Sequence, residues 1–215
     1  MTALRNALRT WRGLVIITGV LLALGLGTAA AIWGPGLFTH GHSAQTATTA
    51  HQPTVSDSSK PVGFSEFRSE QAGFQLAYPS TWTKLSPKDP QVLLLVSQGT
   101  QDSFLVRANE LPEPIGPQQL PAAKQLTDKI VTSNKSIQMI TDPKPLMLGG
   151  LPGFFYFYSF KDPTTGQEGA HSHFFLFNGK TMISMVFQAL PKEHFSEAAK
   201  TFDKIAASFR VLTKH

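Results

Sequence analysis

The fold is decided by residues 153–190, which read GFFYFYSFKDPTTGQEGAHSHFFLFNGKTMISMVFQAL. This stretch predicts strands over 153–160, 168–177 and 181–190 that pair as an antiparallel meander. The last two strands are separated by Asn178-Gly179, and both of these residues tolerate the positive φ angles of a type I′ turn. The first strand is apolar on both of its faces, so the sheet is predicted to be covered on both sides.

Two amphipathic helices are available to cover the sheet. Residues 191–209 carry an apolar stripe at helical spacing, with charged side chains on the opposite face. Residues 117–134 predict the second helix, in which Leu126 and Ile130 lie one turn apart on the apolar face. The predicted fold class is therefore α+β, in the form of an α/β/α sandwich with a largely antiparallel sheet. The stripe of the last helix consists of Phe195, Ala198, Ala199, Phe202, Ile205, Ala206 and Phe209.

Further strands are predicted before the meander. Residues 91–98 and 103–111 are apolar runs separated by a turn, and 136–153 is an extended stretch interrupted by prolines. The opening stretch, GFQLAYPSTW (73–82), alternates apolar and small or polar residues until Pro79. Because proline cannot donate to a strand ladder, we expect the strand to end there and to form the opening edge element of the sheet.

These features resemble the PsbP/Mog1-like superfamily, and especially its exported bacterial members of the actinobacterial LpqN type. The resemblance covers residues 64–213 and rests on the opening stretch, the aromatic meander and a closing helix that runs into Ser208-Phe209-Arg210. It implies that Trp82 folds back as a plug on the sheet or on a helix. Members serve as extrinsic photosystem subunits, regulators of a small GTPase and envelope proteins, with no shared catalytic motif. The resemblance therefore implies a fold and no particular activity.

The N-terminal third predicts a membrane anchor and a tether. Residues 13–33 carry no charge and, as a helix, would span about 30 Å, the thickness of the bilayer hydrocarbon. Three arginines precede this segment, so the positive-inside rule places residues 1–12 in the cytoplasm and the C-terminal domain outside a plasma membrane crossed once. A cleaved signal peptide ending near Ala29-Ala30-Ala31 is the alternative, and the length of the apolar segment favours an uncleaved signal-anchor. Residues 34–62, rich in Ser, Thr, Ala and His, predict a flexible tether, and residues 63–213 predict the folded domain.

The charge distribution argues against nucleic-acid binding. The net charge is +5, but Arg5, Arg9, Arg12 and Lys60 leave 15 of the 19 basic residues for the rest of the chain, and Asp57 leaves 13 of the 14 acidic ones. A nearly balanced domain offers no electrostatic footprint for a phosphate backbone. The chain has no cysteine, which excludes disulfides, thiol nucleophiles and thiolate metal sites.

Few residues are candidates for chemistry. His171 and His173 lie at i and i+2, hence on one face of a strand, but no third metal ligand at suitable spacing accompanies them, which favours a structural or exposed pair. Glu110 and Glu113 flank a proline in a loop, where nothing nearby would raise the pKa of either carboxyl group. The sequon at Asn134 has meaning only with a eukaryotic glycosylation route. We predict no catalytic, cofactor-binding or metal-binding residue.

Two functions remain from different classes. The leading hypothesis is a membrane-anchored extracytoplasmic domain, not an enzyme, that acts as an accessory or docking subunit for envelope or membrane protein complexes. The alternative is a carrier or accessory factor that binds a lipid or small apolar ligand between helix and sheet. If the domain only docks, side chains such as Leu126 and Ile130 should fill the space between helix 117–134 and the sheet.

Overall fold

The computed structural model describes residues 60–213 of the chain. The predicted cytoplasmic segment (1–12), the anchor (13–33) and all but the end of the tether (34–62) lie outside the described residues. Among the helices within 60–213, none has the length and apolar character needed to cross a membrane. The described elements are β1 (Phe64–Ser69), β2 (Phe74–Pro79), β3 (Thr83–Lys84), β4 (Val92–Gln98), β5 (Asp102–Glu110), η2 (Pro117–Gln119), α3 (Leu120–Thr132), β6 (Gln138–Leu148), β7 (Leu151–Lys161), β8 (Glu168–Asn178), β9 (Thr181–Ala189), η3 (Lys192–His194), α4 (Phe195–Ala207) and β10 (Arg210–Val211).

A seven-stranded antiparallel sheet forms the centre of the molecule, in the order β3-β4-β5-β9-β8-β7-β6. The predicted meander is β7-β8-β9, and its strands are neighbours in the sheet. Asn178 pairs with Thr181 across the second turn, where Gly179 has a φ of +58°. This positive φ is the conformation that an Asn-Gly hairpin turn supplies. The prediction of the meander is confirmed.

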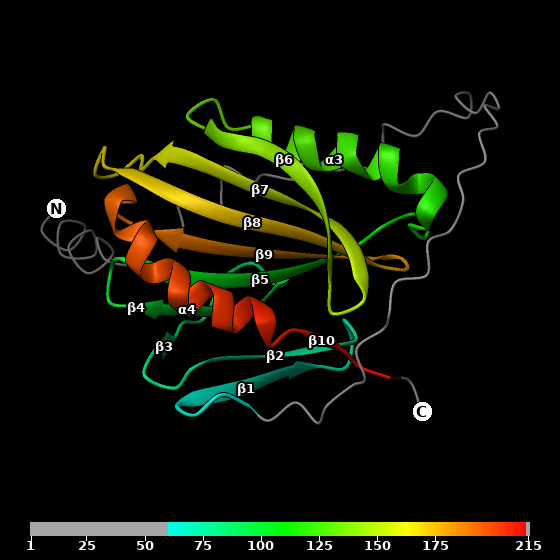
Figure 1. The fold of residues 1–215 in the computed structure, drawn as a ribbon, viewed down its shortest axis with the longest axis horizontal. Coiled ribbons are helices and arrows are strands. Elements are labelled where there is room, and N and C mark those ends of the chain that lie inside the picture. Colours follow the sequence, from blue (N-terminus) through cyan, green and yellow to red (C-terminus); the bar gives the residue numbers. More distant parts are fainter. Residues whose placement is uncertain (1–59, 214–215) are drawn as a thin grey trace, which may run out of the picture.

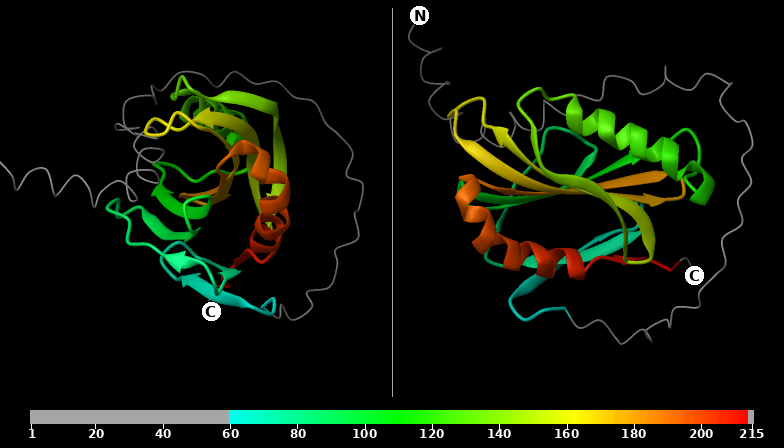
Figure 2. Two further views of the ribbon diagram at one scale, coloured as in Figure 1. Left: turned by 90° about the vertical axis from the view of Figure 1, so that its left-hand side faces the viewer. Right: turned by 45° about the horizontal axis from the view of Figure 1, so that its top comes forward.

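The large sheet is covered on both faces, as its sequence predicts (Figure 1). On β7 and β8 the side chains of Tyr156 and Phe175 pack with α3. Phe174 of β8 and Phe187 of β9 point the other way and pack with α4. Successive strand residues alternate between the two faces, so the two helices lie on opposite sides of the sheet (Figure 2).

One prediction about the sheet is wrong. The strand that ends at Pro79 is β2, and it is the middle strand of a separate three-stranded sheet, β1-β2-β10, not an edge element of the large one. After α4 the chain returns alongside β2, where Arg210 pairs with Gln75. Strand β1, which the sequence analysis did not predict, pairs along the other side of β2. Both edges of β2 are therefore occupied, by segments from opposite ends of the domain.

The small sheet and α4 together enclose the main core. Strand β2 ends at Pro79, as predicted, and Trp82 is buried edge-on against Phe202 of α4, with 6.4 Å between the ring centroids. The backbone N–H of Ala77 donates to the Ser208 hydroxyl over 2.7 Å, which ties β2 to the end of α4. Trp82 thus folds back onto a helix, as the resemblance implies, and it joins the small sheet to the last helix.

The β6–β7 hairpin curls away from the plane of the large sheet towards the C-terminal end of α4 (Figure 1). Its turn contains Gly149 at a φ of +57°. A Cβ atom at Gly149 would lie 2.6 Å from the Cδ1 atom of Phe209, so only glycine fits this close contact. Leu146 and Leu148 of β6 pack on the main core beside it.

We predict that Phe202→Ala lowers the free energy of unfolding by about 3–5 kcal/mol. The Phe202 side chain is 3% exposed, and its ring lies 5.2 Å from the Phe187 ring and 5.8 Å from the Phe195 ring. The matched control is Lys200→Ala, an exposed position on the same helix, where the loss should stay below about 0.5 kcal/mol. Urea unfolding measures both. Equal losses would contradict the packing of α4 on the sheet.

Candidate functional site

The two histidines chosen from the sequence lie on the α3 face of β8 and are fully buried. His171 is 2% exposed and His173 is 0% exposed. The Nδ1 atoms of both rings contact the Tyr158 hydroxyl, at 3.3 Å from His171 and 3.1 Å from His173. The outer nitrogens bind β9, with His171 Nε2 at 3.0 Å from Gln188 Oε1 and His173 Nε2 at 2.6 Å from the Ser184 hydroxyl.

These contacts form one directed chain of hydrogen bonds across three strands. Since an amide oxygen only accepts, His171 donates from Nε2 to Gln188 and accepts from the Tyr158 hydroxyl at Nδ1. Tyr158 then accepts from Nδ1 of His173, and Nε2 of His173 accepts from Ser184. Every donor in this series of hydrogen bonds has one acceptor, and both imidazoles are neutral. A buried network that is fully satisfied in this way holds the register of β7, β8 and β9.

Burial keeps both rings uncharged at neutral pH. It lowers the pKa of His171 to about 4. Burial also holds the pKa of His173 well below its usual range, helped by the nearby His171 and the Arg107 guanidinium. Arg107 is itself buried and pairs with Asp89. Within residues 60–213, no group of three or more His, Asp or Glu side chains is placed to hold a metal ion. The side-chain hydrogen bonds of the pair go to Tyr158 of β7 and to Ser184 and Gln188 of β9.

We predict that acid destabilises the fold through these histidines. Their pKa values are lower in the folded than in the unfolded chain, so the unfolded chain binds more protons as the pH falls from about 6.5 towards 4. Stability should be complete above about pH 6.5 and fall by about 2 kcal/mol per histidine between pH 7 and pH 5. Urea unfolding at both pH values measures the loss. His171→Gln should remove about half of the pH dependence, and an unchanged slope in that variant would contradict the assignment.

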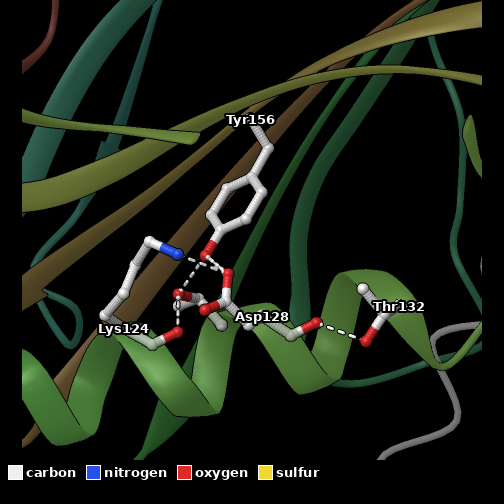
Figure 3. Close-up of polar contacts among 5 residues, drawn as sticks. Lys124, Asp128, Thr132 and Tyr156 are labelled. Carbon is white, nitrogen blue, oxygen red and sulfur yellow. Dashed lines mark hydrogen bonds and ion pairs between the residues drawn. The ribbon is translucent and has the colours of Figure 1, made fainter. Parts of the chain in front are cut away.

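Helix α3 is held on the sheet by a second polar cluster, which Figure 3 shows in close-up. The Tyr156 hydroxyl lies 2.6 Å from the Thr127 hydroxyl and donates to Asp128 Oδ1 over 2.8 Å. Lys124 Nζ binds the same carboxylate oxygen at 2.5 Å and lies 5.4 Å from the centroid of the Tyr156 ring. Burial raises the pKa of Tyr156 above its usual range, so the hydroxyl stays protonated and can donate.

The space beneath α3 is filled. Ile130 is buried, and the half-buried Leu126 packs against the same cluster of aromatic side chains from β7 and β8. This is the packing expected if no ligand occupies the space between helix 117–134 and the sheet. A ligand site between helix and sheet would have to lie away from Leu126 and Ile130, at the start of α3 or at α4.

We predict that Tyr156→Phe costs about 1–2 kcal/mol of stability, because the fully buried Thr127 hydroxyl and the Asp128 carboxylate lose their shared partner. Tyr78→Phe is the control, since the Tyr78 hydroxyl has no hydrogen bond to another described residue, and it should change stability by less than about 0.5 kcal/mol. Hydrogen exchange of the α3 amides should rise in the first variant only. Unchanged α3 exchange in Tyr156→Phe would show that the cluster does not hold the helix.

An apolar groove lies between α4 and the β6–β7 hairpin, on the sheet face away from the histidines. Its volume is about 440 Å³. Strands β7 and β8 form the floor of the groove, α4 forms one wall, and β6 forms the other wall. The lining residues are Lys144, Pro145, Leu146, Phe155, Phe157, Ser172, Phe174, Phe195, Ala199, Phe202 and Asp203.

A second groove, with a volume of about 740 Å³, lies on the other side of β6, against the start of α3. Pro145 and Leu146 line both grooves, so β6 is the wall between them. The same strand carries Met139 and Ile140, each 39% exposed, and Met147, which is 66% exposed. Met147 lines the second groove, whereas Met139 and Ile140 lie further along the strand and line neither groove. We name the three exposed side chains of β6 and the two grooves that this strand separates the β6 face.

The exposed edge of β6 offers few regularly spaced backbone groups for pairing with another strand. Strand β6 is an edge of the large sheet, and its pairing with β7 is interrupted between Met139 and Thr141 and again between Thr141 and Lys144. Pro143 and Pro145 add two positions without an N–H group. Irregular pairing and prolines are the devices that protect edge strands from pairing with other chains. The exposed apolar side chains are therefore the feature of this edge that a partner could contact.

The other candidates from the sequence lie apart from these features. Glu110 and Glu113 are exposed to solvent. Asn134 Oδ1 accepts from the backbone N–H and the hydroxyl of Ser136, which closes the turn after α3.

The partners of the histidine pair and a further contact just before α4 were not predicted from the sequence. Ser184 and Gln188 are polar residues at i and i+4 in an otherwise apolar strand, a signal that could have placed them on the histidine face. His194 Nδ1 lies 3.0 Å from the buried Asp102, and its Nε2 lies 3.3 Å from the exposed Glu197. Burial raises the pKa of Asp102. The contact with Asp102 ties β5 to η3, directly before α4, and nothing in the sequence marks it.

Comparison with known proteins assigns the fold. No protein-family model and no curated protein sequence matches the chain. Among solved structures, the cyanobacterial PsbP (CyanoP) of Synechocystis is similar with a TM-score of 0.54 and 15% identity, covering 74% of this chain and 99% of that one. LpqN of Mycobacterium tuberculosis, described as involved in cell envelope biogenesis, is similar with a TM-score of 0.53 and 12% identity, covering 70% and 92%. The chain has a PsbP/Mog1-like fold, which confirms the predicted resemblance at the level of fold.

Proposed function

We propose that this chain is a membrane-anchored, extracytoplasmic domain without enzymatic activity that acts as a docking or accessory subunit for an envelope or membrane protein complex. The observation that carries the proposal is the β6 face. Within residues 60–213, three of the four exposed large hydrophobic side chains lie on β6, and the fourth, Val62, precedes β1. Exposed apolar side chains on an edge strand that borders apolar grooves are typical of protein-binding surfaces.

The proposed location rests on the N-terminal sequence. Residues 13–33 have the length and composition of a transmembrane helix, and the three arginines before them favour a cytoplasmic N-terminus. A tether of about 30 residues would keep the domain near the membrane and raise its effective concentration towards a membrane-bound partner. LpqN, which shares the fold, is described as involved in cell envelope biogenesis, and this supports an envelope role.

The proposal of a non-enzymatic role rests on where the titratable groups lie. The histidines that could act as general bases are buried, neutral and engaged in hydrogen bonds with one another's partners. Glu110 and Glu113 are exposed, and neither has a described ion-pair partner. General acid–base chemistry needs a group with a suitable pKa that a substrate can reach.

If the domain docks through the β6 face, a charged residue introduced there should prevent a partner from co-purifying with the chain. The intact chain is captured from its own membranes, and the proteins that accompany it are identified. Met147→Glu should reduce the recovery of the partner at least tenfold, because it would bury an unpaired carboxylate in the interface. Val62→Glu is the matched control, since Val62 is also exposed but lies away from β6. Equal recovery with the two variants would contradict docking through the β6 face, once thermal unfolding shows that both are folded.

A second candidate is the carrier of a small apolar ligand, favoured by the groove beside α4. A volume of about 440 Å³ lies within the range of ligand sites, about 300–1,000 Å³. Because side chains fill the space beneath Leu126 and Ile130 of α3, we place this candidate in the groove beside α4. If the domain is a carrier, native mass spectrometry of the chain purified from its own membranes should show one bound species. Ala199→Trp, which fills the groove, should remove that species, while Lys200→Trp should retain it.

A further inference from the structure

A serine hydroxyl lies unpaired on the floor of the groove beside α4. Ser172 of β8 is 6% exposed, lines the groove, and makes no side-chain hydrogen bond to another described residue. An occupant that covers the groove would remove this hydroxyl from water, and the hydroxyl would then need a hydrogen-bond partner from the occupant. The neighbouring histidines on the same strand point to the opposite face and cannot supply it. The groove therefore has one polar position at its floor.

The rest of the groove offers aromatic surface and two charges at the rim. The Phe155 and Phe174 rings on the floor are 4.9 Å apart, and the Phe157 ring lies 4.6 Å from the Phe195 ring on α4. Lys144 on the β6 wall and Asp203 on the α4 wall are both exposed. A rim of opposite charges around an apolar centre is complementary to a peptide that carries an acidic and a basic residue beside an apolar one.

We propose that this groove binds a tyrosine side chain of the partner protein, with the phenol hydroxyl hydrogen-bonded to Ser172. The proposal rests on the docking function and names the residue that the partner contributes. A tyrosine ring packs against phenylalanine rings, and its hydroxyl needs a partner once it is buried. A phenylalanine or an alkyl chain would leave the Ser172 hydroxyl unpaired and desolvated, and would bind less tightly for that reason. Tyrosine is also among the residues that dominate binding energy at interfaces.

The test uses two probes that differ by one hydroxyl group, N-acetyl-tyrosinamide and N-acetyl-phenylalaninamide. Ligand-observed NMR with the full chain in lipid nanodiscs measures the dissociation constant of each. We expect the tyrosine probe to bind about three- to tenfold more tightly than the phenylalanine probe. Ser172→Ala should abolish this preference, and the phenylalanine probe should bind more tightly to the variant than to the wild-type chain because no hydroxyl is then desolvated. Ser196→Ala, at an exposed position on α4, is the control and should retain the preference.

Equal affinity of the two probes for the wild-type chain would overturn the proposal. So would a Ser172→Ala variant that keeps the preference. Filling the groove with Ala199→Trp should weaken both probes, and unchanged binding in that variant would show that they bind elsewhere. If a partner co-purifies but the probes bind equally, docking stands and the tyrosine assignment fails. If the probes discriminate but no membrane protein co-purifies, the docking function fails and the assignment of the occupant to a protein partner fails with it.

Discussion

The structure depends on one constraint, the need to cover both faces of the β7-β8-β9 meander. Aromatic side chains alternate along β7, so that Tyr156 and Tyr158 point to one face while Phe155 and Phe157 point to the other. Exposing either face would leave several hundred Å² of apolar surface in water, at about 25 cal/mol per Å². Helix α3 covers the first face, and the tyrosine hydroxyls find hydrogen-bond partners there. On the second face α4 shares the cover with the small sheet and the β6–β7 hairpin.

The incomplete cover of that second face explains where the grooves lie. Helix α4 packs on β9 and on β2 of the small sheet, with Phe202 and Trp82 at their junction. Phe155, Phe157 and Phe174 of β7 and β8 are only half-buried, because the groove stays open between α4 and the hairpin. The turn of this hairpin is fixed where Gly149 meets Phe209. The same hairpin places exposed methionines on β6. The apolar surface that we propose for docking is thus a consequence of how the chain covers its central strands.

The sequence predicts the long elements well, since their signals are local. The meander, its Asn-Gly turn and both amphipathic helices follow from periodicity, and even the shared face of His171 and His173 follows from strand alternation. Pairing between distant segments is different. The two-residue strand β10 carries no periodic signal, so nothing in the sequence shows that Arg210 pairs with Gln75 and makes β2 a central strand. The groove likewise depends on the path of the β6–β7 hairpin, which is set by tertiary contacts.

The proposed function rests on the contrast between the buried histidine pair and the exposed β6 face. The histidines His171 and His173 are buried with their hydrogen-bond partners, while apolar side chains that could bind a partner are exposed on β6. Methionine oxidation measures this most directly, because Met139 and Met147 are exposed whereas Met182 and Met185 are buried in the core. The intact chain is treated with peroxide in its own membranes and, separately, after purification in detergent, and sulfoxide is quantified by peptide mass spectrometry. The account predicts that Met147 is several-fold less oxidised in membranes than after purification, with the buried pair unreactive in both. Equal oxidation of Met147 in the two settings would contradict a partner on the β6 face.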